Sequence, residues 1–97
     1  MQKTLLSQLS KELDISEQKI LDESISAFLE QELRNVSAEI IHIKMQFHVK
    51  TLEELRHNIE EGKLDEHPAW EQLIYWENLD KKIKVVRDWM QRVHISS

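Results

Sequence analysis

Two Glu-x-x-His pairs are the strongest candidates for metal ligands in this chain: Glu39 with His42, and Glu54 with His57. Side chains three residues apart face the same side of an α-helix. Di-iron helical bundles use such pairs together with carboxylates from other helices. Glu71 or Glu77 could supply the further carboxylate. The sequence therefore leaves open a small Glu/His metal-binding bundle.

The same residues could also be ordinary polar side chains on the solvent-exposed side of a helix, with no metal bound. The stretch Thr51-Leu-Glu-Glu54 fits a capping box, in which Glu54 closes the start of a helix. Chance Glu/His pairs are also expected in a chain with 18 acidic residues and five histidines. We therefore predict no bound metal and no cofactor.

The sequence lacks the residues that other kinds of catalytic site require. The chain has no cysteine, which excludes a thiolate zinc site, a cysteine nucleophile and disulfides. No serine lies in a Gly-x-Ser-x-Gly turn, and a single glycine cannot form a Gly-rich phosphate loop. A narrow helical bundle of this size also offers little pocket volume. We predict that the protein is not an enzyme.

The composition favours one all-α domain spanning residues 1–97. One Gly and one Pro in 97 residues are too few for the turns of a sheet. No apolar run approaches the ~20 residues of a membrane span, and Met1 to Ser7 lack the apolar core of a signal peptide. We therefore expect no membrane association and a cytoplasmic location.

The charge balance points to protein partners. The net charge is −5, and no segment has the dense Lys/Arg face that phosphate binding requires. We predict no direct binding to nucleic acid, and a basic protein partner fits the acidic chain better.

Apolar periodicity predicts a short helix over residues 3–13 and a long one from Ser16 to about His48. Asp14 can adopt the left-handed turn between them, and Ser16 is a good N-cap. The long helix has a heptad seam: Leu29, Leu33, Val36, Ile40, Ile43 and Phe47. Such a helix would be ~50 Å long, whereas a compact globule of this size has a radius of gyration of ~13 Å. We therefore expect an elongated hairpin, a dimer, or both.

Residues 41–49 have a second interpretation. The stretch alternates apolar and polar residues, a pattern typical of a β-strand. A strand here would have to pair across a dimer or with another protein, because no second candidate strand exists in the chain. We favour the helix for this reason.

The C-terminal half predicts two more helices. Thr51 opens a short helix through Ile59, and Gly62 ends it. Pro68 begins the last helix, over about 68–93. The seam of this helix is Trp76, Leu79, Ile83, Val86, Met90 and Val93.

Four large apolar residues of the last helix lie away from that seam: Trp70, Ile74, Val85 and Trp89. One antiparallel neighbour covers one stripe of a helix. The second stripe therefore needs the N-terminal helix, a second subunit or a different protein. Because large aromatic residues often anchor interfaces, we predict that these four residues and Tyr75 bind a partner.

Residues 6–33, LSQLSKELDISEQKILDESISAFLEQEL, resemble the two helices of ribbon-helix-helix proteins. The matching features are Leu9 and Leu13, the Asp14-Ile15-Ser16 turn, then Ile20-Leu21, Ile25, Phe28 and Leu29. These proteins are dimeric DNA-binding repressors, and many are antitoxins. The family's DNA-reading strand precedes the helices, where this chain has only Met1 to Thr4, so no DNA-contacting residue is carried over.

The remaining pattern, with TLEEL, Gly62 and HPAWEQLIYWENL, is similar to small helical prokaryotic antitoxin-type proteins. The resemblance implies a non-catalytic protein–protein interaction module that binds and neutralises a small basic toxin. We expect residues 1–35 to form a homodimer through Leu9, Leu13, Ile20, Leu21, Ile25 and Phe28. Residues 36–97 would form the partner-binding arm, with the acidic side chains Glu53, Glu54, Glu60, Glu61, Asp65 and Glu66. The alternative is a self-assembling scaffold protein.

Overall fold

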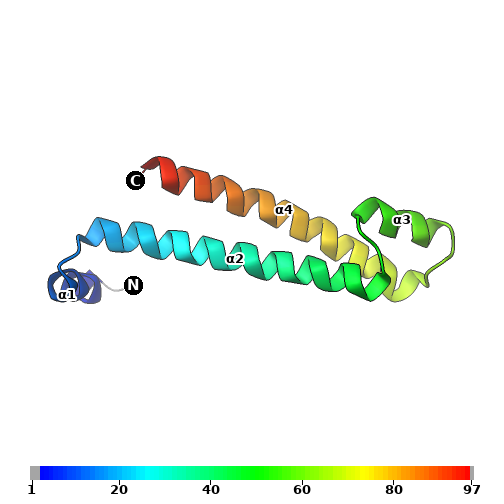
Figure 1. Cartoon of the computed structure of the whole chain (residues 1–97), viewed down its shortest axis with the longest axis horizontal. Helices are drawn as coiled ribbons and strands as arrows, with labels where there is room; N and C mark the ends of the chain where they lie inside the picture. The colour runs from blue at the N-terminus through cyan, green and yellow to red at the C-terminus, as the bar shows by residue number, and fades with distance from the viewer. Residues whose placement is uncertain (1–2, 97) are drawn as a thin grey trace.

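Four α-helices make up the computed structural model, which describes the backbone of residues 3–96 and the side chains of residues 5–93. In chain order they are α1 (Lys3–Leu13), α2 (Glu17–Phe47), α3 (Leu52–Glu60) and α4 (Glu66–Ser96). Helices α2 and α4 run antiparallel as a long hairpin (Figure 1). The predicted all-α architecture is confirmed, with no strand among the described residues.

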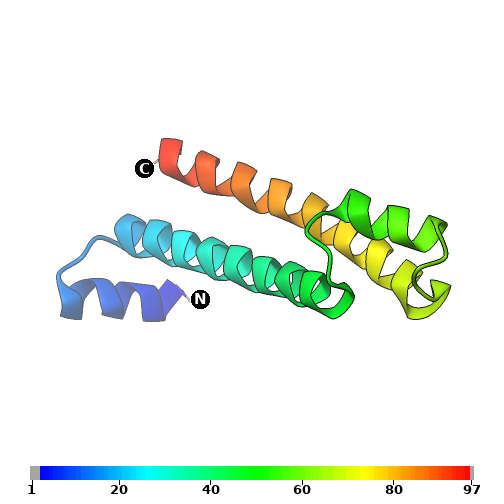
Figure 2. The ribbon, with the colours of Figure 1, turned by 45° about the vertical axis from the view of Figure 1, so that its right-hand side comes forward.

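The molecule is a rod. Its extents are 62 × 23 × 17 Å, and its radius of gyration is 19.5 Å, well above the ~13 Å of a compact chain of similar length. Helix α3 lies beside the first part of α4 at one end of the hairpin, and α1 folds back beside the start of α2 at the other end (Figure 2). The predicted elongated hairpin with a long central helix is therefore confirmed.

Local sequence signals set the ends of the first two helices as predicted. The Ser16 hydroxyl accepts a hydrogen bond of 3.1 Å from the backbone N–H of Lys19, which caps α2. Asp14 has a φ of 55° between the helices, and His48 has a φ of 56° where α2 ends. Both positions are in the left-handed region that short polar side chains tolerate.

The strand interpretation of residues 41–49 is wrong, because α2 continues through Phe47. Ile43 is only 1% exposed, whereas Ile41, two positions earlier, is 54% exposed. A strand would put both side chains on one face, but a helix turns them to different sides. The alternation of apolar and polar residues in this stretch therefore reflects the two sides of a helix.

The predicted capping box at α3 is present with one change. The Thr51 hydroxyl accepts a hydrogen bond from the Glu54 backbone N–H at 3.0 Å. The Glu54 carboxylate accepts from the backbone N–H of Lys50 at 2.9 Å, one residue before the expected donor. After α3, Gly62 adopts a φ of 73°, the conformation that glycine adopts without strain.

Helix α4 has an irregular first turn. His67 interrupts the helical conformation with a φ of −104° and a ψ of 128°. The regular part of the helix therefore begins at Pro68, as the sequence predicts.

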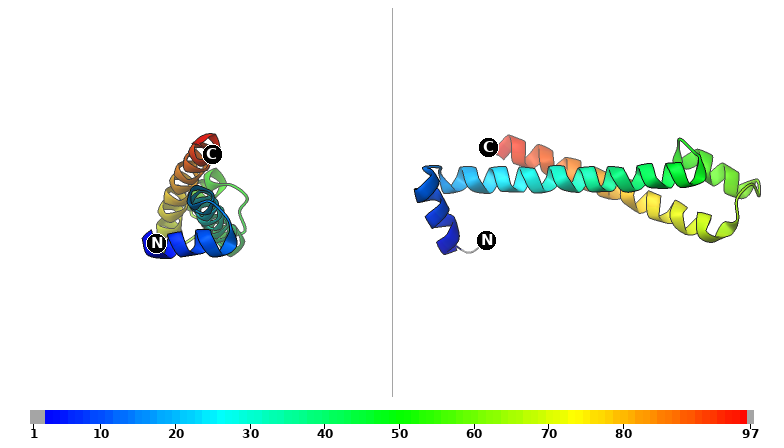
Figure 3. Two further views of the ribbon diagram at one scale, coloured as in Figure 1. Left: turned by 90° about the vertical axis from the view of Figure 1, so that its left-hand side faces the viewer. Right: turned by 60° about the horizontal axis from the view of Figure 1, so that its bottom comes forward.

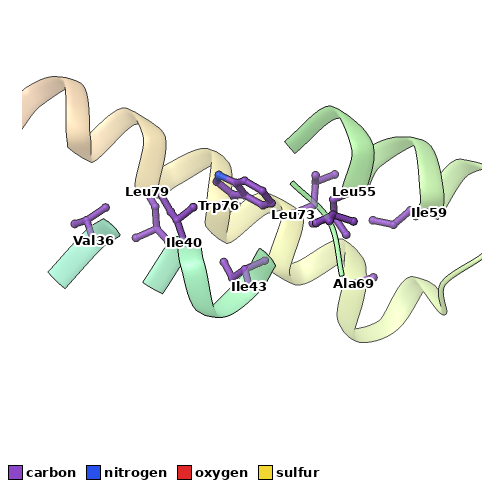
Figure 4. Packing of buried hydrophobic residues seen from close by; sticks show 10 residues of the cluster. Val36, Ile40, Ile43, Leu55, Ile59, Ala69, Leu73, Trp76 and Leu79 are labelled. Atoms are coloured by element: carbon purple, nitrogen blue, oxygen red, sulfur yellow. The ribbon is translucent and has the colours of Figure 1, made fainter. Parts of the chain in front are cut away.

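The core lies where α2, α3 and α4 meet (Figure 4). Its buried residues are Val36, Ile40 and Ile43 of α2, Leu55 and Ile59 of α3, Ala69, Leu73, Trp76 and Leu79 of α4, and Val49. The two predicted seams face each other here. Helix α3 adds a second contact for the start of α4, which buries Ala69 and Leu73 as well.

Candidate protein-interaction surface

An uncovered apolar surface runs along α4. We call Trp70, Ile74, Val85 and Trp89 the α4 stripe; these side chains are between 45% and 57% exposed. The third tryptophan, Trp76, is 3% exposed in the core. The prediction left open that the N-terminal helix covers the stripe, and this is wrong, because α1 packs against α2 and the stripe stays exposed.

The stripe is long and narrow. At ~100° per residue its four members fall within an arc of ~100° around the helix, and at 1.5 Å per residue it spans ~28 Å. Asn78 and Lys81 lie on the same side of α4, between Ile74 and Val85. The surface is therefore apolar at both ends and polar at its centre.

Polar contacts border the stripe on both sides. Towards α2, the Lys82 ammonium lies 3.8 Å from the carboxylate of Glu32. Towards α3, the Arg56 guanidinium lies 3.6 Å from the carboxylate of Glu77. Helices α2 and α3 thus both contact α4, and in the end-on view of Figure 3 they lie to its right.

Tyr75 differs from the four stripe residues. Its side chain is partly exposed, but a hydrogen bond to Glu39 of α2 raises the pKa of the tyrosine hydroxyl, and the nearby carboxylate charge acts in the same direction. The predicted partner-binding residue Tyr75 therefore joins α2 to α4 at the border of the stripe. This contact also gives Glu39 a partner other than His42.

The two tryptophans of the stripe have charged neighbours. The Arg92 guanidinium lies 4.6 Å from the centroid of the Trp89 ring, and it also pairs with Asp88 at 2.9 Å. This cation–π contact between Arg92 and Trp89 holds the Trp89 ring against its own helix. At the other end of the stripe, Trp70 lines a shallow hollow together with Ile59, Glu60 and Glu66.

The end of the rod at α3 is acidic. Six carboxylates are exposed there, on α3, the loop that follows it and the first residue of α4: Glu53, Glu54, Glu60, Glu61, Asp65 and Glu66. His57 lies 3.8 Å from Glu61, and His67 lies 3.3 Å from Glu71. The structure therefore groups the acidic residues that the sequence assigned to a basic partner.

A second exposed apolar group lies at the opposite end. Leu9, Leu13, Leu21, Ile25 and Phe28, which we call the N-terminal patch, are exposed, and Ile20 is half-buried. In Figures 1 and 2 the start of α2 extends beyond the end of α4. Leu21 and Ile25 are exposed in this part of α2, whereas Leu29 further along the helix is buried. The predicted role of this group in dimerisation stays a prediction.

Sequence reasoning missed two exposed apolar residues of α2, Ile41 and Met45. Ile41 lines a shallow groove beside the loop before α3, with Trp76 and Lys44 in its wall. The Lys44 ammonium lies 5.8 Å from the centroid of the Trp76 ring. The spacing of four residues between Ile41 and Met45 was the available signal for a further apolar side of α2.

The Glu/His pairs do not form a metal centre within the described residues, which contain no group of three or more His, Cys, Asp or Glu placed to hold an ion. Glu54 instead caps α3. Across the same part of the chain, no helix has the length and hydropathy needed to cross a membrane.

Comparison with known proteins identifies the family. The model of the family described as "Uncharacterized protein MJ0235 family" matches residues 1–97. The chain belongs to the MJ0235 family. Neither the curated proteins nor the solved structures contain a match. The exposed α4 stripe is therefore the main candidate functional surface of this MJ0235-family chain.

Proposed function

We propose that this MJ0235-family chain is a non-catalytic protein–protein interaction module, and that another polypeptide covers the α4 stripe. The observation that carries the proposal is the contrast among the three tryptophans. Trp76 is buried in the core, whereas Trp70 and Trp89 are each 49% exposed at the ends of one stripe. A contiguous exposed apolar surface with aromatic residues is typical of interfaces.

The energetics support a partner. Fully burying a large apolar side chain contributes ~1.5–3 kcal/mol, and the four stripe residues have about half of their surface still to bury. Association costs ~4–15 kcal/mol in lost translational and rotational freedom. The stripe therefore has to be covered as a unit, since one or two of its residues would not offset this cost.

The absence of catalysis is part of the same proposal. The titratable residues with chemically suggestive spacing lie on open surface or have structural contacts. Glu54 caps α3, Glu39 interacts with Tyr75, and His57 pairs with Glu61. These contacts explain the residues without a reaction.

A finer form of the proposal makes the partner a small basic toxin and the chain a cytoplasmic antitoxin. It is supported by the resemblance of residues 6–33 to ribbon-helix-helix proteins and by the six exposed carboxylates at the α3 end. Such charge would mainly raise the rate of association with a basic protein. In this form residues 1–35 dimerise and residues 36–97 bind the toxin.

The proposal predicts the behaviour of Trp70→Ala and Trp89→Ala. Both changes are expected to reduce the assembly purified from cells towards the 11.6 kDa mass of one chain, because each removes an anchor of the interface. Both variants should keep the helical content of the original protein. Light scattering after size exclusion measures the mass, and far-ultraviolet circular dichroism measures the helix.

Met45→Ala is the matched control, because Met45 is 70% exposed on α2 and lies outside the stripe. The assembly formed by the Met45→Ala variant should have the same mass as that of the original protein. Loss of helical structure in both tryptophan variants would show that the two side chains belong to the core. That result would contradict the proposed interface.

A further inference from the structure

We infer that the polypeptide on the α4 stripe is a second copy of this chain, with its α4 packed antiparallel across a two-fold axis. The inference rests on the proposed function, which requires the stripe to be covered, and it names the partner. In this arrangement Trp70 faces Trp89 of the second copy, and Ile74 faces Val85 of the second copy. Asn78 then faces Lys81 of the second copy at the centre.

The spacing of the stripe carries the argument. Its successive positions are Trp70, Ile74, Asn78, Lys81, Val85 and Trp89, separated by steps of 4, 4, 3, 4 and 4 residues. The steps read the same from both ends, and so do the side-chain types: aromatic, branched aliphatic, polar, polar, branched aliphatic, aromatic. An interface across a two-fold axis requires such self-complementarity, because residue i meets residue j and j meets i. A different protein would impose no such symmetry on this chain.

Charge favours the antiparallel direction. Residues 60–71 carry five acidic residues and one lysine, whereas residues 81–92 carry five basic residues and one aspartate. Antiparallel packing brings the acidic end of each copy towards the basic half of the other. Parallel packing would place the two acidic ends together and Lys81 against Lys81. Like charges held in this way cost free energy.

The edges of the stripe fit the same arrangement. Glu77 contacts Arg56 of α3, and the helical period places Lys84, seven residues later, on the same side of α4. Equivalent sides face each other in an antiparallel helix pair. Glu77 of one copy therefore lies within about one helical turn of Lys84 of the other. On the opposite edge, Tyr75 and Lys82 already contact α2 of their own chain.

At the Trp89 end of the stripe, exposed apolar surface continues onto α2. Because α2 and α4 are antiparallel, Ile25 and Phe28 of the N-terminal patch lie towards the same end of the hairpin as Trp89 (Figure 1). A second copy that covers Trp89 lies close to this patch as well. Four of the six carboxylates at the α3 end belong to the acidic stretch that this packing brings towards the basic half of the second copy: Glu60, Glu61, Asp65 and Glu66.

The cysteine-free sequence allows a direct test with the double variant Ile74→Cys/Val85→Cys. Within one chain these positions are ~16 Å apart along α4, too far for a disulfide, which needs Cα atoms ~4.4–6.8 Å apart. Packed helices have axes ~8–10 Å apart, and their Cα atoms lie ~2.3 Å from each axis. Facing positions of two copies are therefore within disulfide range.

We expect mild oxidation of the purified double variant to convert most of it into a covalent dimer that a reductant reverses. Asn78→Cys/Lys81→Cys places cysteines at facing positions in the centre of the stripe, keeps both tryptophans, and should give the same product. The single variant Ile74→Cys is the matched control, because the two Ile74 positions lie ~16 Å apart along the helices of an antiparallel dimer, and it should stay largely uncrosslinked. Denaturing electrophoresis without reductant measures the products.

Efficient crosslinking of the single variant Val85→Cys would show parallel packing and overturn the inference. Absence of a covalent dimer from both in-register pairs would also overturn it. If Trp89→Ala still releases a different polypeptide from an assembly, the proposed function stands without the inference. If the original chain is alone and monomeric, both fail.

Discussion

Replacing Ile43 by alanine is expected to lower the free energy of unfolding by about 2–5 kcal/mol. Ile43 is 1% exposed in the core between α2 and α4. Truncation removes its transfer free energy and leaves a cavity that its neighbours fill only in part. Urea-induced unfolding, followed by circular dichroism, measures the change in free energy.

Ile41→Ala is the matched control, since it changes the same residue type two positions earlier in α2. Ile41 is 54% exposed, so its truncation should cost less than about 1 kcal/mol. The comparison also tests the secondary structure of residues 41–49. In a strand, Ile41 and Ile43 would share one face. Equal losses of unfolding free energy in Ile41→Ala and Ile43→Ala would therefore contradict a helix in this stretch.

Trp76→Ala is expected to lower the free energy of unfolding by about 3–5 kcal/mol. Its ring is buried between α2 and α4 (Figure 4), and the Lys44 ammonium lies over it. Since the ring belongs to the core of one chain, the loss should not depend on protein concentration. Unfolding curves recorded at several protein concentrations measure it.

Trp70→Ala provides the contrast. Any stability that it loses should depend on protein concentration, because Trp70 acts through association with another chain. A Trp76→Ala loss no larger than that of Trp70→Ala, at every concentration, would contradict the division of the tryptophans into core and interface.

Periodicity and capping residues predicted most of the fold. The heptad seams of α2 and α4, the N-caps Ser16 and Thr51, and the left-handed turn at Asp14 are local features, and each depends on residues within about two helical turns. Leu73 was missed although its signal was present. Continuing the α4 seam backwards from Trp76, in steps of three and four residues, leads to Leu73 and Ala69.

Features that depend on how helices lie against each other could not be predicted. Tyr75 looked like one more interface aromatic, but the register of α4 against α2 places it beside Glu39, 36 residues earlier. The position of α1 could not be predicted either. Its apolar residues predicted a helix, but nothing in their spacing indicated that α1 would pack on α2 and leave Trp70 and Trp89 exposed.

From the sequence, the candidate interface could be predicted only as a set of apolar residues that lie outside the main seam of α4. Four apolar residues off the main seam indicated a second stripe, and the structure leaves that stripe exposed. What covers it depends on another chain, which a local pattern does not identify. The symmetric spacing between Trp70 and Trp89 is the feature of the α4 stripe that points to a second copy.

Photocrosslinking in the cell from position 85 tests whether another polypeptide covers the α4 stripe. A photoreactive amino acid in place of Val85 should form one defined adduct, because the stripe is covered by another polypeptide. The same amino acid in place of Glu30, which is exposed on α2, is the control and should not form that adduct. Mass spectrometry of the adduct identifies the partner as a second copy or as a different, basic protein. A folded chain that forms no adduct from position 85 would contradict the claim that the α4 stripe is an interface.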